Sequence, residues 1–232
     1  MTTAICVLRS GGRYGPIWAE RLAAGLRAHL PGLARTVCLT DHDGPVPGCE
    51  TVPLRHDWPG WWSKFEAFRP GLVDGPALLL DLDTVLVGTA GDLIGSGLAV
   101  LEDQTFENRV SSALMRFEAG AMAFLYRRFA ADPARWMDRA SCPDAPNRIH
   151  GDQVVIDRFL RDEAIVPGFL QRLHPGLIQI RWSQSQPVEA PVQVFVHRCK
   201  PDAIGGPVAR AWAYSAARAS TGRPNRAATS GA

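Results

Sequence analysis

The sequence contains no apolar stretch approaching the roughly 20 residues that a helix needs to cross a bilayer. Its opening segment, Met1–Arg9, is too short and too weakly patterned for a secretory signal peptide. We therefore expect a cytoplasmic protein without a membrane span.

Regular cysteine spacing is absent as well. The five cysteines are scattered, and none of them forms the C-x-x-C pair that is typical of zinc sites and redox disulfides. A structural zinc site or a disulfide framework is therefore not expected.

Lysine is almost missing from the chain. Lys64 and Lys200 are the only two lysines, and every other basic residue is an arginine. The 25 basic and 23 acidic residues give a formal net charge of +2, and no basic run is present, so nucleic acid is not an expected partner. Because an ammonium is a compact point charge, the two lysines of an arginine-rich chain indicate positions where a site needs one.

Apolar periodicity predicts an α/β fold. Trp18, Leu22, Leu26 and Leu30 recur at every fourth position, which favours a helix over Ile17–Leu30 that ends at Pro31-Gly32. Helices are also expected at Trp61–Phe68, Ala119–Ala131 and Val154–Leu160. Strands are expected at Thr3–Leu8, Thr36–Thr40, Ala77–Leu82, Ser111–Phe117 and Val192–His197. This alternation is typical of a sheet covered by helices.

The length of 232 residues and the apolar content of 46% favour one domain, which we place at residues 1–214. From Ser215 onward the chain lacks apolar periodicity and is rich in Ala, Ser, Arg and Gly. A disordered tail is therefore predicted at residues 215–232.

Two carboxylates follow the most apolar predicted strand. Asp81 and Asp83 stand two residues apart, so they lie on the same side of the pleat at the sheet edge where α/β proteins bind ligands. Mg²⁺ and Mn²⁺ prefer carboxylate oxygens and commonly bridge protein to phosphate, which favours a metal-diphosphate site. A simple turn that faces water is the alternative explanation of the pair.

Two classes of enzyme use this pattern. Asp81-Leu82-Asp83-Thr84-Val85 fits the D-x-D-x-[TV] motif of haloacid-dehalogenase-like, Mg²⁺-dependent phosphatases, and Gly151-Asp152 with Asp157 resembles their downstream acidic motif. That family's nucleophile strand usually opens the domain, whereas here a complete β-α-β unit comes first. No lysine stands between Thr84 and Gly151, where these phosphatases usually carry one. The second class, the metal-dependent sugar transferases, is therefore favoured.

Four motifs in order resemble those of GT-A fold glycosyltransferases of the glycogenin-like family 8 group. They are Lys64, Asp81-x-Asp83, Gly151-Asp152-Gln153 and His197 with Lys200-Pro201, and the resemblance spans about residues 3–202. Gly60-Trp61-Trp62-Ser63-Lys64 together with Asp81-Leu82-Asp83-Thr84 is similar to a group of small bacterial proteins identified as glycosyltransferases by fold. The resemblance implies a Rossmann-like fold with a mixed, mostly parallel sheet flanked by helices.

The resemblance also implies an activity and a metal. The expected reaction transfers a hexose from a nucleotide-diphosphate sugar, a UDP-sugar in this family, to a hydroxyl acceptor with retention of anomeric configuration. Mn²⁺ or Mg²⁺ is the expected cofactor, with Asp81, Asp83 and His197 as its ligands. Val194 stands where the family places its metal histidine, so His197 replaces it only if the loop is shorter here. A degenerate domain that binds nucleotide-sugar without catalysis, or that binds only a protein partner, is the remaining alternative.

The resemblance assigns further contacts to the donor. Gln153 and Asp152 are expected to contact the transferred sugar and act as the catalytic residues, although Asp152 also suits a helix cap. The residues expected to hold the nucleotide and its diphosphate are Leu8, Arg9, Ser10, Gly11, Asp41, Lys64, Asp81 and Lys200. Asp41 is equally typical of a turn.

Three tryptophans precede or enter the predicted helix at Trp61–Phe68. Trp58, Trp61 and Trp62 have the aromatic faces that can stack on a sugar, but such a cluster more often packs a helix against a sheet. We therefore expect all three in the core.

Overall fold

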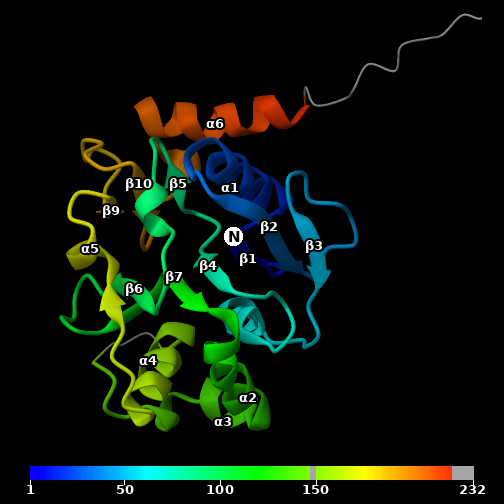
Figure 1. The fold of residues 1–232 in the computed structure, drawn as a ribbon, viewed down its shortest axis with the longest axis vertical. Coiled ribbons are helices and arrows are strands. Elements are labelled where there is room, and N and C mark those ends of the chain that lie inside the picture. The colour runs from blue at the N-terminus through cyan, green and yellow to red at the C-terminus, as the bar shows by residue number, and fades with distance from the viewer. Residues whose placement is uncertain (147–149, 221–232) are drawn as a thin grey trace, which may run out of the picture.

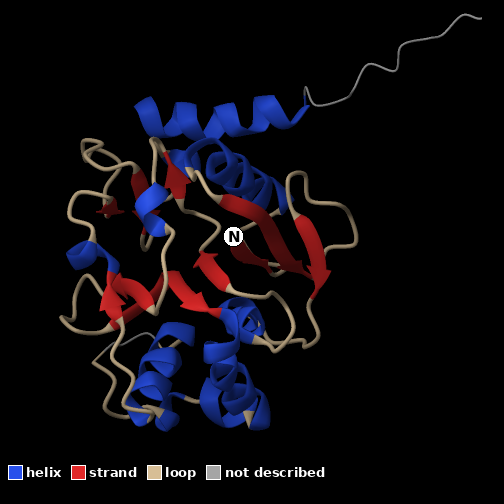
Figure 2. Cartoon of the chain, viewed as in Figure 1, coloured by secondary structure: helices blue, strands red, loops and turns tan. Residues whose placement is uncertain are grey.

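The computed structural model describes residues 1–146 and 150–220, with side chains described as far as residue 213. Within these residues the strands form two sheets, and helices lie on two sides of the larger one (Figures 1 and 2). This arrangement confirms the predicted α/β fold with a mixed, mostly parallel sheet. No helix in the described part of the chain is long and apolar enough to cross a membrane.

The larger sheet has seven strands in the order β3-β2-β1-β4-β7-β6-β8. β1 pairs in parallel with β2 and β4, β2 with β3, and β6 with β8, while β7 runs antiparallel to β4 and β6. Its strands are β1 (Thr2–Leu8), β2 (Leu33–Thr40), β3 (Glu50–Pro53), β4 (Pro76–Leu80), β6 (Ala99–Glu102), β7 (Val110–Glu118) and β8 (Gly168–Phe169). Because β7 is reversed, its first residues lie beside the carboxyl end of β4.

The smaller sheet has three strands in the order β5-β10-β9. They are β5 (Val85–Leu86), β9 (Ile178–Arg181) and β10 (Val192–Phe195). β5 follows β4 after a turn in which the Thr84 N–H donates to the Asp81 carbonyl at 3.0 Å. The turn between Asp81 and Thr84 therefore leads from one sheet to the other.

Helices cover both faces of the larger sheet, and the strands are apolar on both sides as a result. In β1, Ala4, Cys6 and Leu8 pack in one buried cluster with α1 and α6, while Ile5 packs in the other. The helices are α1 (Pro16–His29), α2 (Ala123–Ala131), α3 (Pro133–Met137), α4 (Asp152–Asp162), α5 (Leu170–Leu173) and α6 (Gly206–Ser220). Figure 1 shows α1 and α6 on one side of the sheet and α2, α3 and α4 on the other.

The described residues also form short 3₁₀ helices. They are η1 (Gly60–Phe68), η2 (Gly91–Leu93), η3 (Ala119–Met122), η4 (Arg139–Ser141) and η5 (Pro201–Ala203). The helix predicted at Trp61–Phe68 is thus η1, which is wound more tightly than an α-helix.

Several predicted boundaries differ from the structure. The strand predicted at Ala77–Leu82 is β4, which ends at Leu80, and the helix predicted at Ala119–Ala131 is η3 followed by α2.

Two further differences lie in the last part of the chain. β10 ends at Phe195, so His197 lies beyond the strand with a positive φ of 52°. α6 continues to Ser220, so the tail predicted at residues 215–232 overlaps this helix over residues 215–220. The remainder of that prediction, residues 221–232, lies outside the described residues.

Candidate functional site

A pocket of about 570 Å³ opens where β1 and β4 end and β7 begins. Its walls come from segments far apart in the chain: the loop after β1, η1, the turn after β4, the start of β7, the start of α4 and the segment after β10. The volume is within the range of about 300–1,000 Å³ that is usual for small-molecule sites. The carboxyl edge of a parallel sheet is also where α/β proteins usually bind ligands.

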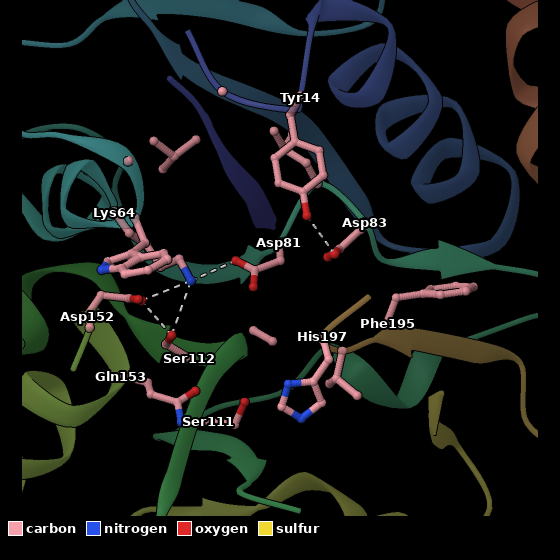
Figure 3. Close-up of a pocket in the computed structure, with 18 of the residues that line it drawn as sticks. Tyr14, Lys64, Asp81, Asp83, Ser111, Ser112, Asp152, Gln153, Phe195 and His197 are labelled. Atoms are coloured by element: carbon pink, nitrogen blue, oxygen red, sulfur yellow. Dashed lines mark hydrogen bonds and ion pairs between the residues drawn. The ribbon is translucent and has the colours of Figure 1, made fainter. Parts of the chain in front are cut away.

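Lys64 lies in one wall of this pocket and joins three elements. Its Nζ is 2.7 Å from Oδ1 of Asp81 and 2.9 Å from Oδ2 of Asp152, and it donates to Oγ of Ser112 at 3.1 Å. The Ser112 hydroxyl in turn donates to Oδ2 of Asp152 at 2.6 Å. Figure 3 shows these four side chains converging on one point, which we call the Lys64 cluster.

Burial and charge act in opposite directions on the Lys64 cluster. Burial alone lowers the pKa of Lys64, but the charges of Asp152 and Asp81 outweigh it and raise that pKa above its usual value. Burial raises the pKa of Asp81, the charges of Asp83 and Asp152 raise it further, and Lys64 lowers it only in part. Burial is thus the main reason why the pKa of Asp81 is raised.

Glu66 fixes the backbone that carries Lys64. Its buried carboxylate accepts hydrogen bonds at 2.8 Å from the N–H groups of Arg55 and His56, and the guanidinium of Arg69 donates to it at 2.8 Å. At the start of η1 the Ser63 hydroxyl donates to the Gly60 carbonyl at 2.7 Å. Both contacts hold the 3₁₀ turn on which the lysine stands.

Lys200 forms a second ion pair with the acidic motif. Its Nζ is 2.5 Å from Oδ2 of Asp83, and the Tyr14 hydroxyl donates to the same oxygen at 2.9 Å. Burial raises the pKa of Tyr14, and the neighbouring charge of Asp83 raises it further, so the phenol stays protonated and remains a donor. Both lysines of the chain thus lie in one pocket, each paired with one carboxylate of the motif.

A row of aromatic rings supports Tyr14 from behind. Tyr14 meets Trp18 of α1 edge-on with ring centroids 4.7 Å apart, and Trp18 meets Trp212 of α6 in the same way at 4.7 Å. The guanidinium of Arg21 lies over the Trp212 ring at 4.8 Å. This row, Tyr14–Trp18–Trp212, connects the last helix to the hydrogen bond on Asp83.

The loop after β1 also contributes to the pocket lining. Arg9 lines the pocket and pairs with Asp41 at 2.9 Å and with Asp57. The N–H of Ser10 donates to Oδ1 of Asp41 at 2.7 Å. Burial opposes ionisation of Asp41, but the hydrogen bonds from Ser10 and the charge of Arg9 outweigh it and lower its pKa. Asp41 therefore holds the loop in place as an anion.

Gln153 and His197 line the pocket between these groups. The amide Nε2 of Gln153 donates to Oδ2 of Asp103 at 2.9 Å, which fixes its orientation at the start of α4. His197 is exposed, and its ring stacks against Trp182 with centroids 5.8 Å apart. Figure 3 shows His197 across the pocket from Lys64 and Asp152.

The side chains of Asp81 and Asp83 both border the pocket, and their oxygens are of the kind that Mn²⁺ and Mg²⁺ prefer. Two ammonium groups, those of Lys64 and Lys200, pair with the three carboxylates of Asp81, Asp83 and Asp152, and this imbalance also fits a divalent cation. In the part of the chain that the structure describes, however, no three His, Cys, Asp or Glu side chains gather into a group that could hold a metal. The predicted set of Asp81, Asp83 and His197 is therefore not assembled here, and it remains a prediction.

Eight of the residues predicted from the sequence line this one pocket: Arg9, Lys64, Asp81, Asp83, Asp152, Gln153, His197 and Lys200. Four others do not. Leu8 packs in the buried core, while Ser10, Gly11 and Asp41 are exposed and do not line the pocket. Gly11 has a φ of +83°, so it serves the turn of the loop.

Several other lining residues could not be predicted from the sequence. Tyr14 stands in a glycine-rich loop, and Ser112 is one of many small polar residues, so neither has a local signature. Trp61 was expected in the core, yet it lines the pocket and is 53% exposed. The other two tryptophans of that group, Trp58 and Trp62, are buried as predicted.

No protein-family model matches the sequence. No curated protein has significant sequence similarity to it. The fold, in contrast, is similar to that of the glycosyltransferase GlyE of Streptococcus pneumoniae TIGR4. Its apo form matches with a TM-score of 0.62 at 14% identity, over 92% of this chain and 59% of that one.

A second crystal structure of GlyE matches with a TM-score of 0.63 at 13% identity, over 93% of this chain and 61% of that one. The chain thus spans about three fifths of the length of these solved structures. At such identity the likeness establishes a fold shared with a glycosyltransferase, and the role of each residue has to be argued from this chain.

Proposed function

We propose that this chain transfers a hexose from a nucleotide-diphosphate sugar, specifically a UDP-sugar, to a hydroxyl acceptor. The observation that carries the proposal is the convergence of both lysines of the chain on the two carboxylates of one motif, in one pocket. The fold shared with a glycosyltransferase supports it and favours it over the phosphatase hypothesis.

The donor would lie along the pocket with its nucleotide toward Arg9 and the loop after β1. Lys200 is the natural partner of the diphosphate, because an ammonium binds phosphate as a point charge and its present partner is a single carboxylate. Asp81 and Asp83 would hold Mn²⁺ or Mg²⁺, and the bound ion would add positive charge at the departing diphosphate. His197 is the proposed third ligand.

The transferred sugar would lie against the Lys64 cluster. Asp152 has its carboxylate oriented by Lys64 and Ser112, which suits it to accept hydrogen bonds from sugar hydroxyls. Gln153 is held by Asp103 beside it, and an amide can contact the sugar without acting as a base. These fixed groups orient the donor before reaction, which lowers the entropic part of the barrier.

In the transfer step the bond between the anomeric carbon and the diphosphate oxygen breaks, and its electron pair leaves with the diphosphate. The acceptor oxygen forms the new bond to that carbon, and its proton passes to the departing diphosphate. Lys200 stabilises the charge that develops on the leaving group. Retention of anomeric configuration is part of the proposal.

Thermal unfolding with UDP and Mn²⁺, separately and together, tests the donor site. A ligand present at about 100 times its Kd stabilises by about 2.7 kcal/mol, which raises the Tm of a domain of this size by roughly 5–10 °C. We expect such a shift only when both are present, and we expect Asp83→Ala to abolish it. Asp92→Ala is the matched control, because Asp92 is exposed and lies outside the pocket.

A shift with UDP that does not depend on metal would overturn the metal part of the proposal. Release of phosphate from a phosphomonoester through a trapped aspartyl-phosphate would favour the phosphatase instead. Binding of UDP with Mn²⁺, but no turnover of any UDP-sugar, would point to a degenerate domain that only binds the donor.

A further inference from the structure

The seven tryptophans of the chain divide sharply by exposure. Five are at most 7% exposed, namely Trp18, Trp58, Trp62, Trp136 and Trp212. Trp61 and Trp182 are 53% and 47% exposed. Leaving an indole in water forgoes the free energy of burying its apolar surface, so exposed tryptophans are common where a ligand or partner covers them.

Trp61 forms part of the pocket wall beside the Lys64 cluster. Its indole lies against Gly151, where an added Cβ would come within 3.1 Å of the indole Nε1. A residue with a side chain at position 151 would therefore press on the ring. Gly151 immediately precedes Asp152 and Gln153, so the indole is held next to the two residues that we place at the transferred sugar.

Trp182 is not itself part of the pocket lining, but it contacts a residue that is. Its ring stacks on His197, which lines the pocket across from Lys64 and Asp152 (Figure 3). The loop that carries it is closed by Gln186, whose side-chain oxygen accepts from the N–H groups of Trp182 at 2.6 Å and Ser183 at 3.1 Å. The indole is thus held by its loop as well as by the imidazole.

Neutral polar side chains also line this pocket. Gln104, Thr105 and Ser111 line it together with Gln153 and His197. A pyranose ring has an apolar face of C–H groups and a rim of hydroxyls, so it binds where aromatic faces adjoin neutral hydrogen-bonding side chains. The pocket offers both, whereas a long apolar groove for a lipid chain is not what these residues build.

We propose that Trp61 and Trp182 flank the acceptor, and that the acceptor is a saccharide whose pyranose ring stacks on these indoles. The inference rests on the proposed transferase function and names its acceptor class. The donor occupies the charged side between Arg9 and the Lys64 cluster. Trp182, which lies beyond His197, is left for the molecule that receives the sugar.

The test measures release of UDP from the UDP-sugar that the protein hydrolyses fastest, with and without added saccharides. Suitable probes are methyl α- and β-glucoside, methyl β-galactoside, maltose, cellobiose and lactose. We expect at least one of them to accelerate release and to become glycosylated. Trp61→Ala and Trp182→Ala should each lower the ratio of transfer to hydrolysis about tenfold, the scale of one lost aromatic contact. Leu173→Ala is the matched control, because Leu173 is also an exposed apolar side chain (51%), but it neither lines the pocket as Trp61 does nor stacks on a lining residue as Trp182 does.

Two results would overturn the inference while leaving the proposed function standing. One is intact hydrolysis of the UDP-sugar that no saccharide in the panel accelerates. The other is an unchanged ratio of transfer to hydrolysis in both tryptophan variants. Absence of both UDP binding and UDP-sugar hydrolysis in the unaltered protein would instead refute the proposed function, and the acceptor assignment would fall with it.

Discussion

The ammonium of Lys200 lies 2.5 Å from Oδ2 of Asp83, although 117 positions separate the two residues in the chain. The pair joins the segment after the small sheet's β10 to the turn after β4 of the large sheet. A bound diphosphate would compete with Asp83 for this ammonium. This competition is what the proposed donor site requires of Lys200.

Replacement of Lys200 by alanine is expected to weaken UDP binding about 10- to 100-fold in the presence of Mn²⁺. The reason is the loss of a hydrogen bond between charged groups, worth about 1.5–3 kcal/mol. Isothermal titration calorimetry with UDP measures it. Arg198→Ala is the control. It also removes one positive charge, only two residues from Lys200, but the side chain of Arg198 is exposed and does not line the pocket. An equal loss of UDP affinity in both variants would mean that the net positive charge of this region matters and not a direct contact from Lys200.

Lys64→Met is expected to destabilise the protein by roughly 3–5 kcal/mol, because it leaves Asp81 and Asp152 without their shared buried partner. Adding Asp152→Asn should restore part of that loss, since one uncompensated charge then disappears. Equilibrium unfolding in urea measures both variants. Strictly additive losses in the double variant would contradict the coupling that we infer within the Lys64 cluster.

Glu66→Ala is expected to lower stability by about 3–5 kcal/mol, because it removes the acceptor of two backbone N–H groups and leaves the buried guanidinium of Arg69 without its carboxylate partner. The same urea experiment applies. Glu50→Ala, which removes an exposed carboxylate paired with Arg35, should cost less than about 1 kcal/mol. A small effect at Glu66 would show that η1 does not depend on this carboxylate.

Trp212→Ala is expected to lower stability by about 3–5 kcal/mol, since it opens a cavity next to Trp18. Trp182→Ala removes the same side chain from an exposed position and should change stability by about 0.5 kcal/mol or less. Thermal and urea unfolding distinguish the two. Comparable losses would mean that the loop at Trp182 carries more of the fold than its exposure indicates.

The product of transfer is expected to keep the anomeric configuration of the donor. Proton NMR of the first product, recorded before any mutarotation of released sugar, identifies the anomer through its coupling constant. A product of inverted configuration would contradict the proposed role of Gln153 as a sugar-contacting amide in a retaining transferase. It would require a general base in the pocket instead.

Much of the fold and of the site could be predicted from local pattern. The spacing of Trp18, Leu22, Leu26 and Leu30 at every fourth position predicts α1. The run of apolar residues before Asp81 predicts β4, a strand that is buried on both faces. The scarcity of lysine pointed to Lys64 and Lys200, and the structure brings both to one pocket.

What the sequence could not reveal depends on contacts between distant segments. Ser112 reaches the Lys64 cluster because β7 runs antiparallel to β4, and nothing within β7 itself encodes that direction. Trp61 and Trp62 separate because successive side chains of a 3₁₀ helix point about 120° apart, so one indole enters the core and its neighbour faces the pocket.

The row of rings from Tyr14 through Trp18 to Trp212 links α6 to the hydrogen bond on Asp83. A phenol that must hold its hydroxyl toward Asp83 depends on a side chain placed nearly two hundred positions later. Changes made near the end of the chain, such as a purification tag fused close to α6, are thus best judged by donor affinity as well as by yield.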